Sequence, residues 1–293
     1  MLPNTLWRPW EPRAVFPVFA DAQNTVDFMV QDDGNHSLRS LAMPFYSVLK
    51  KRKSVSGAFR DYRNLILRRP YRFRGALISR AGEFIKQWDL GRRLRTGDYF
   101  SVNINRLCSD AGVRLVDGQL VLIANRGRAD VWSSSPGSAT MRYVGESYVA
   151  GFRTGLFTRV LNPVSGKKHV GFTGINPQVL VGSDIVASVL LLNHSSDPGH
   201  DRAVTPTIRL YRNQCDFLEC SFGEIPPHGA LERTVLDLFS EARDFLKSTG
   251  GRGFTIVRAA GVSLASIHLL RSLSNTTLGM DHSRPAFTNV VDY

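Results

Sequence analysis

The pattern of apolar and polar residues changes near Gly97, from helical spacing before it to strand-like runs after it. Beyond residue 97, short stretches rich in Val, Leu, Ile and Tyr are separated by turn residues roughly every 8 to 12 positions, which is typical of an antiparallel β-sandwich. The strands predicted in this way cover residues 99–104, 112–116, 119–125, 139–144, 147–152, 156–161, 168–172, 185–193, 206–212, 216–221, 254–259, 262–270 and 277–281.

One predicted helix interrupts these strands. Within residues 232–247, Val235, Leu238 and Ala242 fall on one face at helical spacing, and Thr234 is a suitable N-cap. The sequence therefore predicts a mainly β chain with a single helix of about four turns in its last third.

A short internal repeat suggests that the sandwich has two halves. The run LVLIAN, ending at Asn125, is followed by MRY at 141–143, and VLLLN, ending at Asn193, is followed at the same interval by RLY at 209–211. The second unit thus repeats the first, with Asn193 in the place of Asn125. The alternative is that this match arises by chance, because the chain contains many similar strands. We expect two stacked halves of immunoglobulin-like topology.

The first 96 residues follow a different pattern. Four prolines among Trp and Phe residues in the first 36 positions exclude a long helix and favour an extended arm, which lies across its own domain or on a partner. Two later stretches have the spacing of short amphipathic helices, with apolar stripes formed by Val55, Phe59, Tyr62, Leu65 and Ile66 and by Leu77, Ala81, Phe84, Ile85 and Trp88.

The predicted organisation therefore has four parts. An extended arm covers residues 1–36, and a basic helical docking segment covers 37–96. The first sandwich half covers 97–177, and the second covers 178–293 with the helix at about 232–247 inserted.

The charge of the chain is concentrated in the docking segment. Residues 50–95 contain 15 basic and three acidic residues, a net charge of +12, whereas the remainder has 22 of each sign and is neutral. A focused positive band on a neutral body predicts an anionic partner. The residues expected to bind it are Lys50, Lys51, Arg52, Lys53, Arg60, Arg63, Arg68, Arg69, Arg72, Arg74, Arg80, Arg92 and Arg93.

The apolar stripes narrow the choice of partner. Apolar stripes bordered by arginines are typical of helices that lie in an anionic membrane interface or dock on a membrane-protein complex. The residues expected to make the apolar docking contacts are Phe59, Tyr62, Ile66, Phe84, Ile85 and Trp88. Two alternatives use the same residues: the stripes pack on the chain's own β body, or residues 50–95 bind nucleic acid through phosphate contacts and base stacking.

The sequence contains few residue patterns that indicate catalysis or metal binding. The loop NHSSDPGHDR offers His194, His200 and Asp201 as metal ligands, although the same residues also favour a hydrogen-bonded turn. The chain has no GxSxG, Walker or Rossmann motif, and its three cysteines do not have zinc-site spacing. We expect no cofactor and no identifiable small-molecule substrate.

These observations favour a non-enzymatic protein. No signal peptide is visible, and no apolar run approaches the roughly 20 residues of a membrane span. We therefore expect a cytoplasmic subunit or scaffold, peripheral to a membrane, that docks through its basic region and stabilises an assembly. A nucleic-acid-binding protein is the first alternative, and a metal-dependent enzyme or ligand-binding module at residues 193–202 is the second.

Overall fold

The fold is built almost entirely from antiparallel sheets. In the computed structural model, the described residues are 11–30, 71–94, 99–126, 137–152, 171–193, 200–262, 264–274, 276–282 and 284–285. Every strand pair among them is antiparallel, and the strands form three sheets of four strands and one of five. The mainly β, antiparallel fold expected from the sequence is confirmed.

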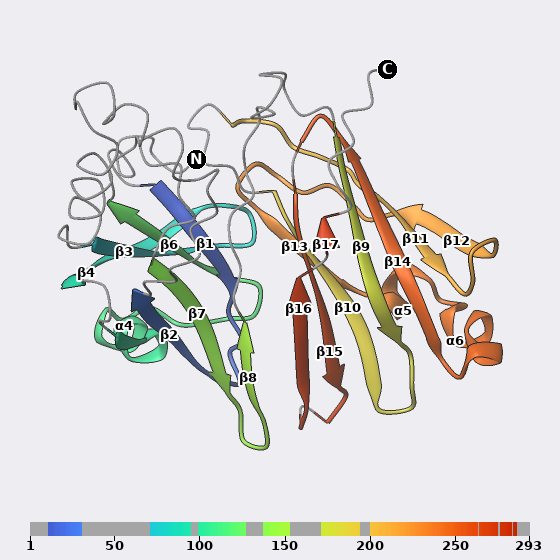
Figure 1. The fold of residues 1–293 in the computed structure, drawn as a ribbon, viewed down its shortest axis with the longest axis horizontal. Coiled ribbons are helices and arrows are strands. Elements are labelled where there is room, and N and C mark those ends of the chain that lie inside the picture. Colours follow the sequence, from blue (N-terminus) through green and yellow to red (C-terminus); the bar gives the residue numbers. More distant parts are fainter. Residues whose placement is uncertain are drawn as a thin grey trace, which may run out of the picture.

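The first eight strands make two sheets, which we call the first module (Figure 1). Its sheets have the strand orders β1-β6-β3-β4 and β5-β2-β7-β8. Its elements are β1 (Glu11–Pro17), β2 (Gln23–Val30), β3 (Tyr71–Ile78), β4 (Phe84–Leu94), β5 (Tyr99–Asn103), α4 (Ile104–Asp110), β6 (Leu120–Arg126), β7 (Gly137–Val144) and β8 (Val149–Phe152).

The remaining strands make the second module, with the sheet orders β12-β11-β14-β9-β17 and β13-β10-β15-β16. Its strands are β9 (Gly171–Leu180), β10 (Ile185–Leu192), β11 (Thr207–Tyr211), β12 (Phe217–Ser221), β13 (Ala230–Thr234), β14 (Arg252–Ala260), β15 (Ala265–Ser272), β16 (Leu278–His282) and β17 (Arg284–Pro285). Its helical turns are α5 (Val235–Leu238), α6 (Ala242–Phe245) and the 3-10 turn η1 (Lys247–Thr249).

The two modules share one topology. Adding eight to each strand number of the first module reproduces both sheet orders of the second, with β17 as an extra edge strand. The helical insertion also recurs between equivalent strands, as α4 after β5 and as α5 and α6 after β13. The strand order therefore repeats, but the repeat expected from the sequence is wrong, because its alignment of Asn125 with Asn193 placed β6 on β10, whereas β2 is the equivalent of β10.

Aromatic rings fill the space between the two sheets of the first module. The ring of Phe28 on β2 lies 4.7 Å, between centroids, from those of Phe73 on β3 and Phe100 on β5. Tyr143 is fully buried, and its hydroxyl donates to the carbonyl of Pro17 at 2.8 Å. This hydrogen bond satisfies the one polar atom that the ring carries into the core.

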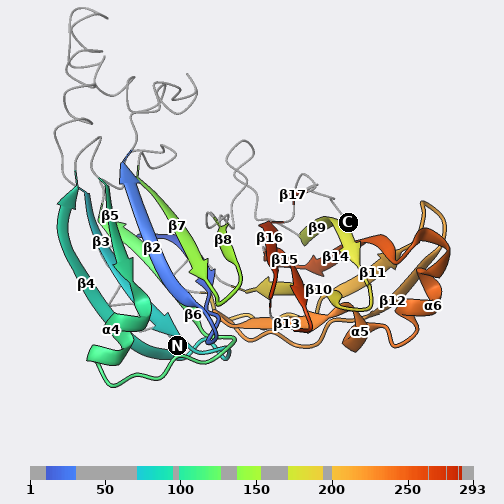
Figure 2. The ribbon, with the colours of Figure 1, turned by 90° about the horizontal axis from the view of Figure 1, so that it is seen from below.

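The sheet β13-β10-β15-β16 has apolar residues on both faces. On β10, Leu190 and Leu192 belong to the core of the first module, whereas Val189 and Leu191 belong to that of the second. Side chains alternate between the faces of a strand, so this sheet lies between the two cores (Figure 2). The two modules are therefore joined by a continuous apolar layer.

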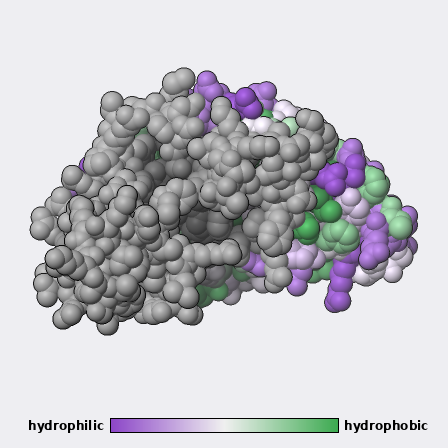
Figure 3. All heavy atoms as spheres, turned by 45° about the horizontal axis from the view of Figure 1, so that its top comes forward, coloured by the Kyte–Doolittle hydropathy of each residue, from purple (hydrophilic) through white to green (hydrophobic). Residues whose placement is uncertain are grey.

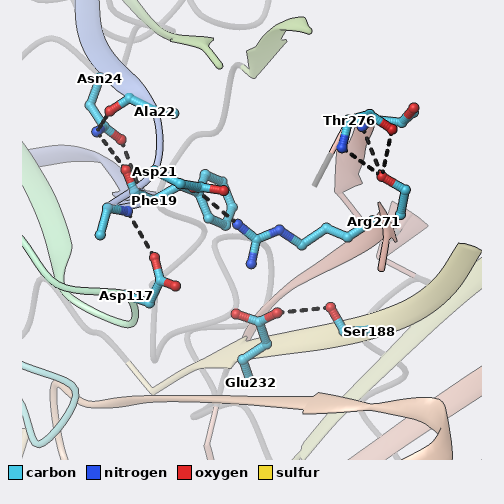
Figure 4. Close-up of polar contacts among 12 residues, drawn as sticks. Phe19, Asp21, Ala22, Asn24, Asp117, Ser188, Glu232, Arg271 and Thr276 are labelled. Carbon is cyan, nitrogen blue, oxygen red and sulfur yellow. Dashed lines mark hydrogen bonds and ion pairs between the residues drawn. The ribbon is translucent and has the colours of Figure 1, made fainter. Parts of the chain in front are cut away.

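Polar contacts also link the two modules at this boundary, which we call the joint. The Arg271 guanidinium of the second module lies 4.4 Å from the centroid of the Phe19 ring and 3.5 Å from the Asp21 carboxylate. Figure 4 shows the Arg271 side chain extending toward both residues. At another point of the joint, the backbone N–H of Ala230 donates to the carbonyl of Arg80 at 2.9 Å.

The helix expected around residues 77–88 is wrong, because this stretch is the β3–β4 hairpin. A tight turn at Ser79–Glu83, with Gly82 at φ +82°, separates the two strands and gives their apolar residues an apparent helical spacing. The other expected stripe, from Val55 to Ile66, lies outside the described residues. None of the helices in the described residues has the length and hydrophobicity needed to cross a bilayer.

Other expectations differ in detail. Residues 230–247 start as a strand and continue as two single helical turns, although the predicted Thr234 cap is present as a capping box. Residues 112–116 are not a strand. The expected boundary between the two halves, at 177/178, falls inside β9. The stretch expected to be an arm and a helical docking segment instead contributes β1 to β4, within residues 11–94, to the sheets of the first module.

The two described prolines of the expected arm, Pro12 and Pro17, are compatible with a strand because of their positions. Strand β1 is an edge strand, Pro12 borders its register shift, and Pro17 is its last residue. These are the places in a sheet where a missing N–H costs least.

Candidate anion-binding end of the first module

One end of the first module holds the strand ends that border residues 31–70 in the sequence. Val30, the last residue of β2, is the register partner of Gly137, the first residue of β7. Tyr71, the first residue of β3, pairs with Leu94, the last residue of β4. Only residues 95–98 separate β4 from β5, so both sheets present these strand ends to the same side (Figure 2). We call this side the basic end.

The predicted anion-binding residues divide into three groups. Lys50, Lys51, Arg52, Lys53, Arg60, Arg63, Arg68 and Arg69 lie outside the described residues, between β2 and β3 in the sequence. Arg72, Arg74, Arg92 and Arg93 lie on β3 and β4, toward the basic end. Arg80 lies in the β3–β4 turn at the opposite end, beside the second module, so the structure separates it from the others.

Three arginine residues occupy one cross-strand row at the basic end. Arg72 on β3 is the register partner of Arg93 on β4 and of Arg126 on β6. We call Arg93, Arg72 and Arg126 the arginine row. Sequence analysis missed Arg126 because it lies some 30 positions beyond the basic band, and only the register of β6 brings it to the row.

An arginine in the other sheet of the first module is already neutralised. Arg142 on β7 donates through Nε to the Asp27 carboxylate at 3.0 Å. The same carboxylate accepts hydrogen bonds from the hydroxyls of Ser101 and Tyr99 at 2.5 and 3.0 Å. Burial acts to raise the pKa of Asp27, but these hydrogen bonds and the charge of Arg142 outweigh it and lower that pKa. Asp27 therefore stays ionised, and it balances Arg142.

Arg74 also has partners within the sheet. Its register partner on β4 is Asp89, and with the Gln87 amide oxygen facing the guanidinium, Nε and Nη1 of Arg74 donate to it at 2.9 and 3.0 Å. The second module has a similar arrangement, because Arg209 on β11 is the register partner of Glu219 on β12 and forms an ion pair with it.

The predicted apolar docking residues do not form a free surface where the structure describes them. Phe84, Ile85 and Trp88 are partly buried and pack against the core of the first module. Phe59, Tyr62 and Ile66 lie outside the described residues. The alternative in which the stripe covers the chain's own β body therefore applies to the second stripe.

A groove of about 590 Å³ runs between the edge strands β4 and β5 and helix α4. Its charged residues are Asp89, Asp110 and Arg106, and Arg106 lies 3.8 Å from Asp110. Two carboxylates against one guanidinium disfavour an anionic ligand in this groove. The other lining residues are Leu90, Tyr99, Phe100, Ser101, Val102, Asn103 and Leu107.

The described members of the predicted metal-ligand set, His200 and Asp201, do not take part in a metal-binding group. His200 Nε2 lies 2.9 Å from Oδ1 of the buried Asn193, and its ring contacts that of His228 edge to face. Asp201 is exposed, and His194 lies outside the described residues. Within the described part of the chain, no three His, Cys, Asp or Glu side chains are grouped as a metal site would require.

The three cysteines are free thiols with different environments. Cys108 is buried, and burial raises the pKa of its thiol to about 11. Burial and the nearby Glu241 and Glu219 raise the pKa of Cys220, whereas Cys215 is exposed. A raised thiol pKa disfavours the reactive thiolate, so Cys108 and Cys220 have little nucleophilic character.

Comparison with known proteins identifies no family. No protein-family model matches this chain, and no curated protein matches its sequence. Two solved structures align over most of the chain: a Streptomyces avermitilis α-L-rhamnosidase complexed with L-rhamnose (8% identity, 94% of this chain and 26% of that chain, TM-score 0.24) and a Bacteroides uniformis β-glucuronidase (10% identity, 92% and 25%, TM-score 0.16). The chain spans about a quarter of each, and TM-scores this low support no conclusion about it.

Proposed function

We propose that this chain is a non-enzymatic subunit that binds nucleic acid through the basic end of its first module. The observation that carries the proposal is the net charge of +12 within residues 50–95 of an otherwise neutral chain. The first part of that stretch, residues 50–70, lies in the connection that leaves β2 at Val30 and enters β3 at Tyr71, and both of these residues are at the basic end. A concentrated positive charge is the electrostatic footprint of phosphate binding.

The packing of β4 favours nucleic acid over a membrane surface. A helix that lies in a membrane interface needs an exposed apolar stripe beside its basic residues. The second stripe lies on strands instead, and Phe84, Ile85 and Trp88 pack on the core. Binding to a phosphodiester backbone requires the charges but not the stripe, so this packing leaves its main requirement intact.

The architecture supports a division between scaffold and binding end. We interpret the two facing sheets of each module as a β-sandwich, so that the chain is two stacked halves of immunoglobulin-like character. In such folds the connections between strands gather at the ends and carry the binding residues, while the sheets hold them in place. The surface of the second module visible in Figure 3 mixes hydrophilic and hydrophobic patches, which suits a scaffold.

A salt series tests the proposal. We expect the full chain to bind a fluorescein-labelled 20-nucleotide single strand, with log K falling linearly against log salt by about 0.7 for each phosphate contact. Replacing Lys50, Lys51, Arg52 and Lys53 by Gln is expected to reduce that slope by up to about 3. The matched control replaces four basic residues of the second module, all exposed: Arg233, Lys247, Arg252 and Arg258.

Two results would contradict the proposal. One is equal loss of slope in the control variant, since the charge would then act without regard to position. The other is co-sedimentation with vesicles of mixed phosphatidylcholine and phosphatidylserine while the oligonucleotide stays unbound. The second result would favour a membrane surface as the partner.

A further inference from the structure

Strand β5 is an edge strand without the features that usually protect an edge. It pairs with β2 on one side, and no other described strand pairs with it. Its residues, Tyr99–Asn103, include no charged residue and no proline, and its pairing with β2 has no register shift. Charged side chains, prolines and bulges are the usual means by which an edge strand avoids pairing with another chain. β5 therefore has the character of a strand that accepts a further strand at its edge.

The other edge strands of the described residues are protected. β1 contains Pro12 and Pro17, β4 has two register shifts in its pairing with β3, and β8 lies against β16. The remaining edge strands each contain at least one charged residue, at Glu219, Glu232, Arg233, Asp281 or Arg284. The exception among the described edges is thus β5.

The second module allows a comparison position by position. β13 is the equivalent of β5, and each strand is followed by the N-cap residue of a helical turn, Thr234 in one case and Asn103 in the other. Counting back from these caps, Glu232 on β13 corresponds to Ser101 on β5. The same topology therefore has a charge at the middle of this edge in the second module and an uncharged serine in the first.

The flank of β5 also borders an open groove. All five of its residues line the groove of about 590 Å³ between β4, β5 and α4, and Tyr99 is 60% exposed. In the second module, burial and the nearby Glu241 raise the pKa of Cys220 on β12, so the segment after β13 reaches the equivalent of β4. A further strand can approach β5 from the side of the groove.

We propose that β5 pairs in antiparallel sense with β5 of a second copy of this chain. The two copies present the same edge to each other, as a two-fold dimer requires, and their four-stranded sheets join into one sheet of eight strands. With Ser101 at the two-fold axis, Tyr99 of each copy lies opposite Asn103 of the other, and no like charges oppose each other. The proposal goes beyond the proposed function and does not depend on what binds at the basic end.

The charge distribution selects the antiparallel sense. β5 begins at the basic end, close in sequence to the stretch of net charge +12 at residues 50–95. Parallel pairing would place two such ends side by side, and they would repel each other. Antiparallel pairing places them at opposite ends of the dimer, so a neutral edge meets a neutral edge.

The size of the contact sets the expected affinity. Pairing over the five residues of β5 extends about 17 Å along the strands. Interfaces that bury less than about 1,200 Å² belong to weak complexes. We therefore expect a dimer with a dissociation constant in the micromolar range, which separates on dilution.

Sedimentation equilibrium of the full chain without nucleic acid tests for the dimer. Over a range of about 2 to 200 µM, we expect the average mass to rise from 32.6 kDa toward twice that value. Ser101→Lys should weaken the dimer about fivefold or more, because the two-fold axis brings the introduced charges opposite each other. Within one copy the new ammonium faces Asp27, the register partner of Ser101, so the fold should be retained.

The matched control makes the same change on another edge. Ser221 is an exposed serine on the edge strand β12, and Ser221→Lys should leave the dissociation constant of the dimer unchanged. Circular dichroism melting checks that both variants fold.

Hydrogen exchange on the wild type locates the contact without any substitution. At the high end of the concentration range, the amides of Tyr99–Asn103 should exchange more slowly than at the low end. Those of Phe217–Ser221, on β12, should exchange equally at both concentrations.

Three results would overturn the proposal. One is a mass that stays at the monomer value throughout the range. Another is a dimer that Ser101→Lys and Ser221→Lys weaken equally, and the third is a dimer without slower exchange at β5, because the contact would then lie elsewhere. Neither experiment contains nucleic acid, so failure of the proposed function would leave these outcomes unchanged.

Discussion

Gly82 lies where the two modules touch, at the tip of the β3–β4 hairpin. Its φ of +82° is in the left-handed region, and a Cβ added to it would lie 2.6 Å from the carbonyl oxygen of Pro227 and 2.9 Å from the carbonyl carbon of His228. Both of these atoms are backbone, so no side chain can rotate away to make room. Gly82→Ala must therefore either strain the hairpin or separate the two turns.

The expected cost has two parts. Placing a Cβ on a left-handed backbone costs about 1 to 2 kcal/mol. Separating the turns enough to remove the contact weakens the hydrogen bond from Ala230 N–H to the Arg80 carbonyl, worth about 1 kcal/mol, and loosens the apolar layer beside it. We expect Gly82→Ala to lower the free energy of unfolding by about 3 kcal/mol in total. Gly112→Ala is the control, because Gly112 has φ +67° with nothing within 4 Å of an added Cβ, and should cost only about 1 to 2 kcal/mol.

Urea unfolding followed by fluorescence and far-UV circular dichroism measures both variants. Because the added cost of Gly82→Ala arises between modules, we also expect its transition to broaden or to split in two, whereas that of Gly112→Ala stays single. Equal destabilisation by the two substitutions would refute the reasoning, since the contact with Pro227 would then contribute nothing.

Three further predictions concern the second module and the thiols. Asn193→Ala should cost about 3 kcal/mol in urea unfolding, because the buried amide donates to three backbone carbonyls; a loss below about 0.5 kcal/mol, on the order of an ordinary surface change, would contradict this. Burial and the neighbouring His200 lower the pKa of His228 from 6.5 to about 4, so between these values the folded protein binds fewer protons than the unfolded chain. Stability should therefore fall as the pH is lowered through this window, by about 1 to 2 kcal/mol because solvent screens the partly exposed ring. His228→Gly should remove that loss while relieving a positive φ of 61°, and an unchanged pH slope in the variant would count against the prediction. Iodoacetamide at pH 8 should label Cys215 in the folded protein and Cys108 only after unfolding, as checked by mass spectrometry, and labelling of Cys108 in the native state would contradict its burial.

The sequence predicts β10, β11, β12 and β14 of the second module because each has a local signal, whereas it misses β13 and most of β9. Strands such as β11 and β12 are short, alternate apolar with polar residues, and are bounded by turn residues. The Thr234 cap is equally local, since the capping box lies within four consecutive residues. These features depend only on neighbours in the chain.

The β3–β4 hairpin could not be predicted in the same way. Leu77 and Trp88 lie on different strands, and the turn between them imitates the spacing of a helical stripe. What makes β3 a strand is its pairing with β6, more than 40 positions later in the sequence. The arginine row depends on the same pairing, so composition could locate the positive charge but not the register that aligns Arg72 with Arg126.

The two modules also differ in the length of one connection between equivalent strands. Forty residues join β2 to β3, whereas 14 join the equivalent strands β10 and β11. The entropy lost on closing a loop grows only with the logarithm of its length, so this difference costs at most about 1 kcal/mol. The same strand order therefore accepts either connection, and the longer one contains residues 50–70, the first part of the positively charged stretch.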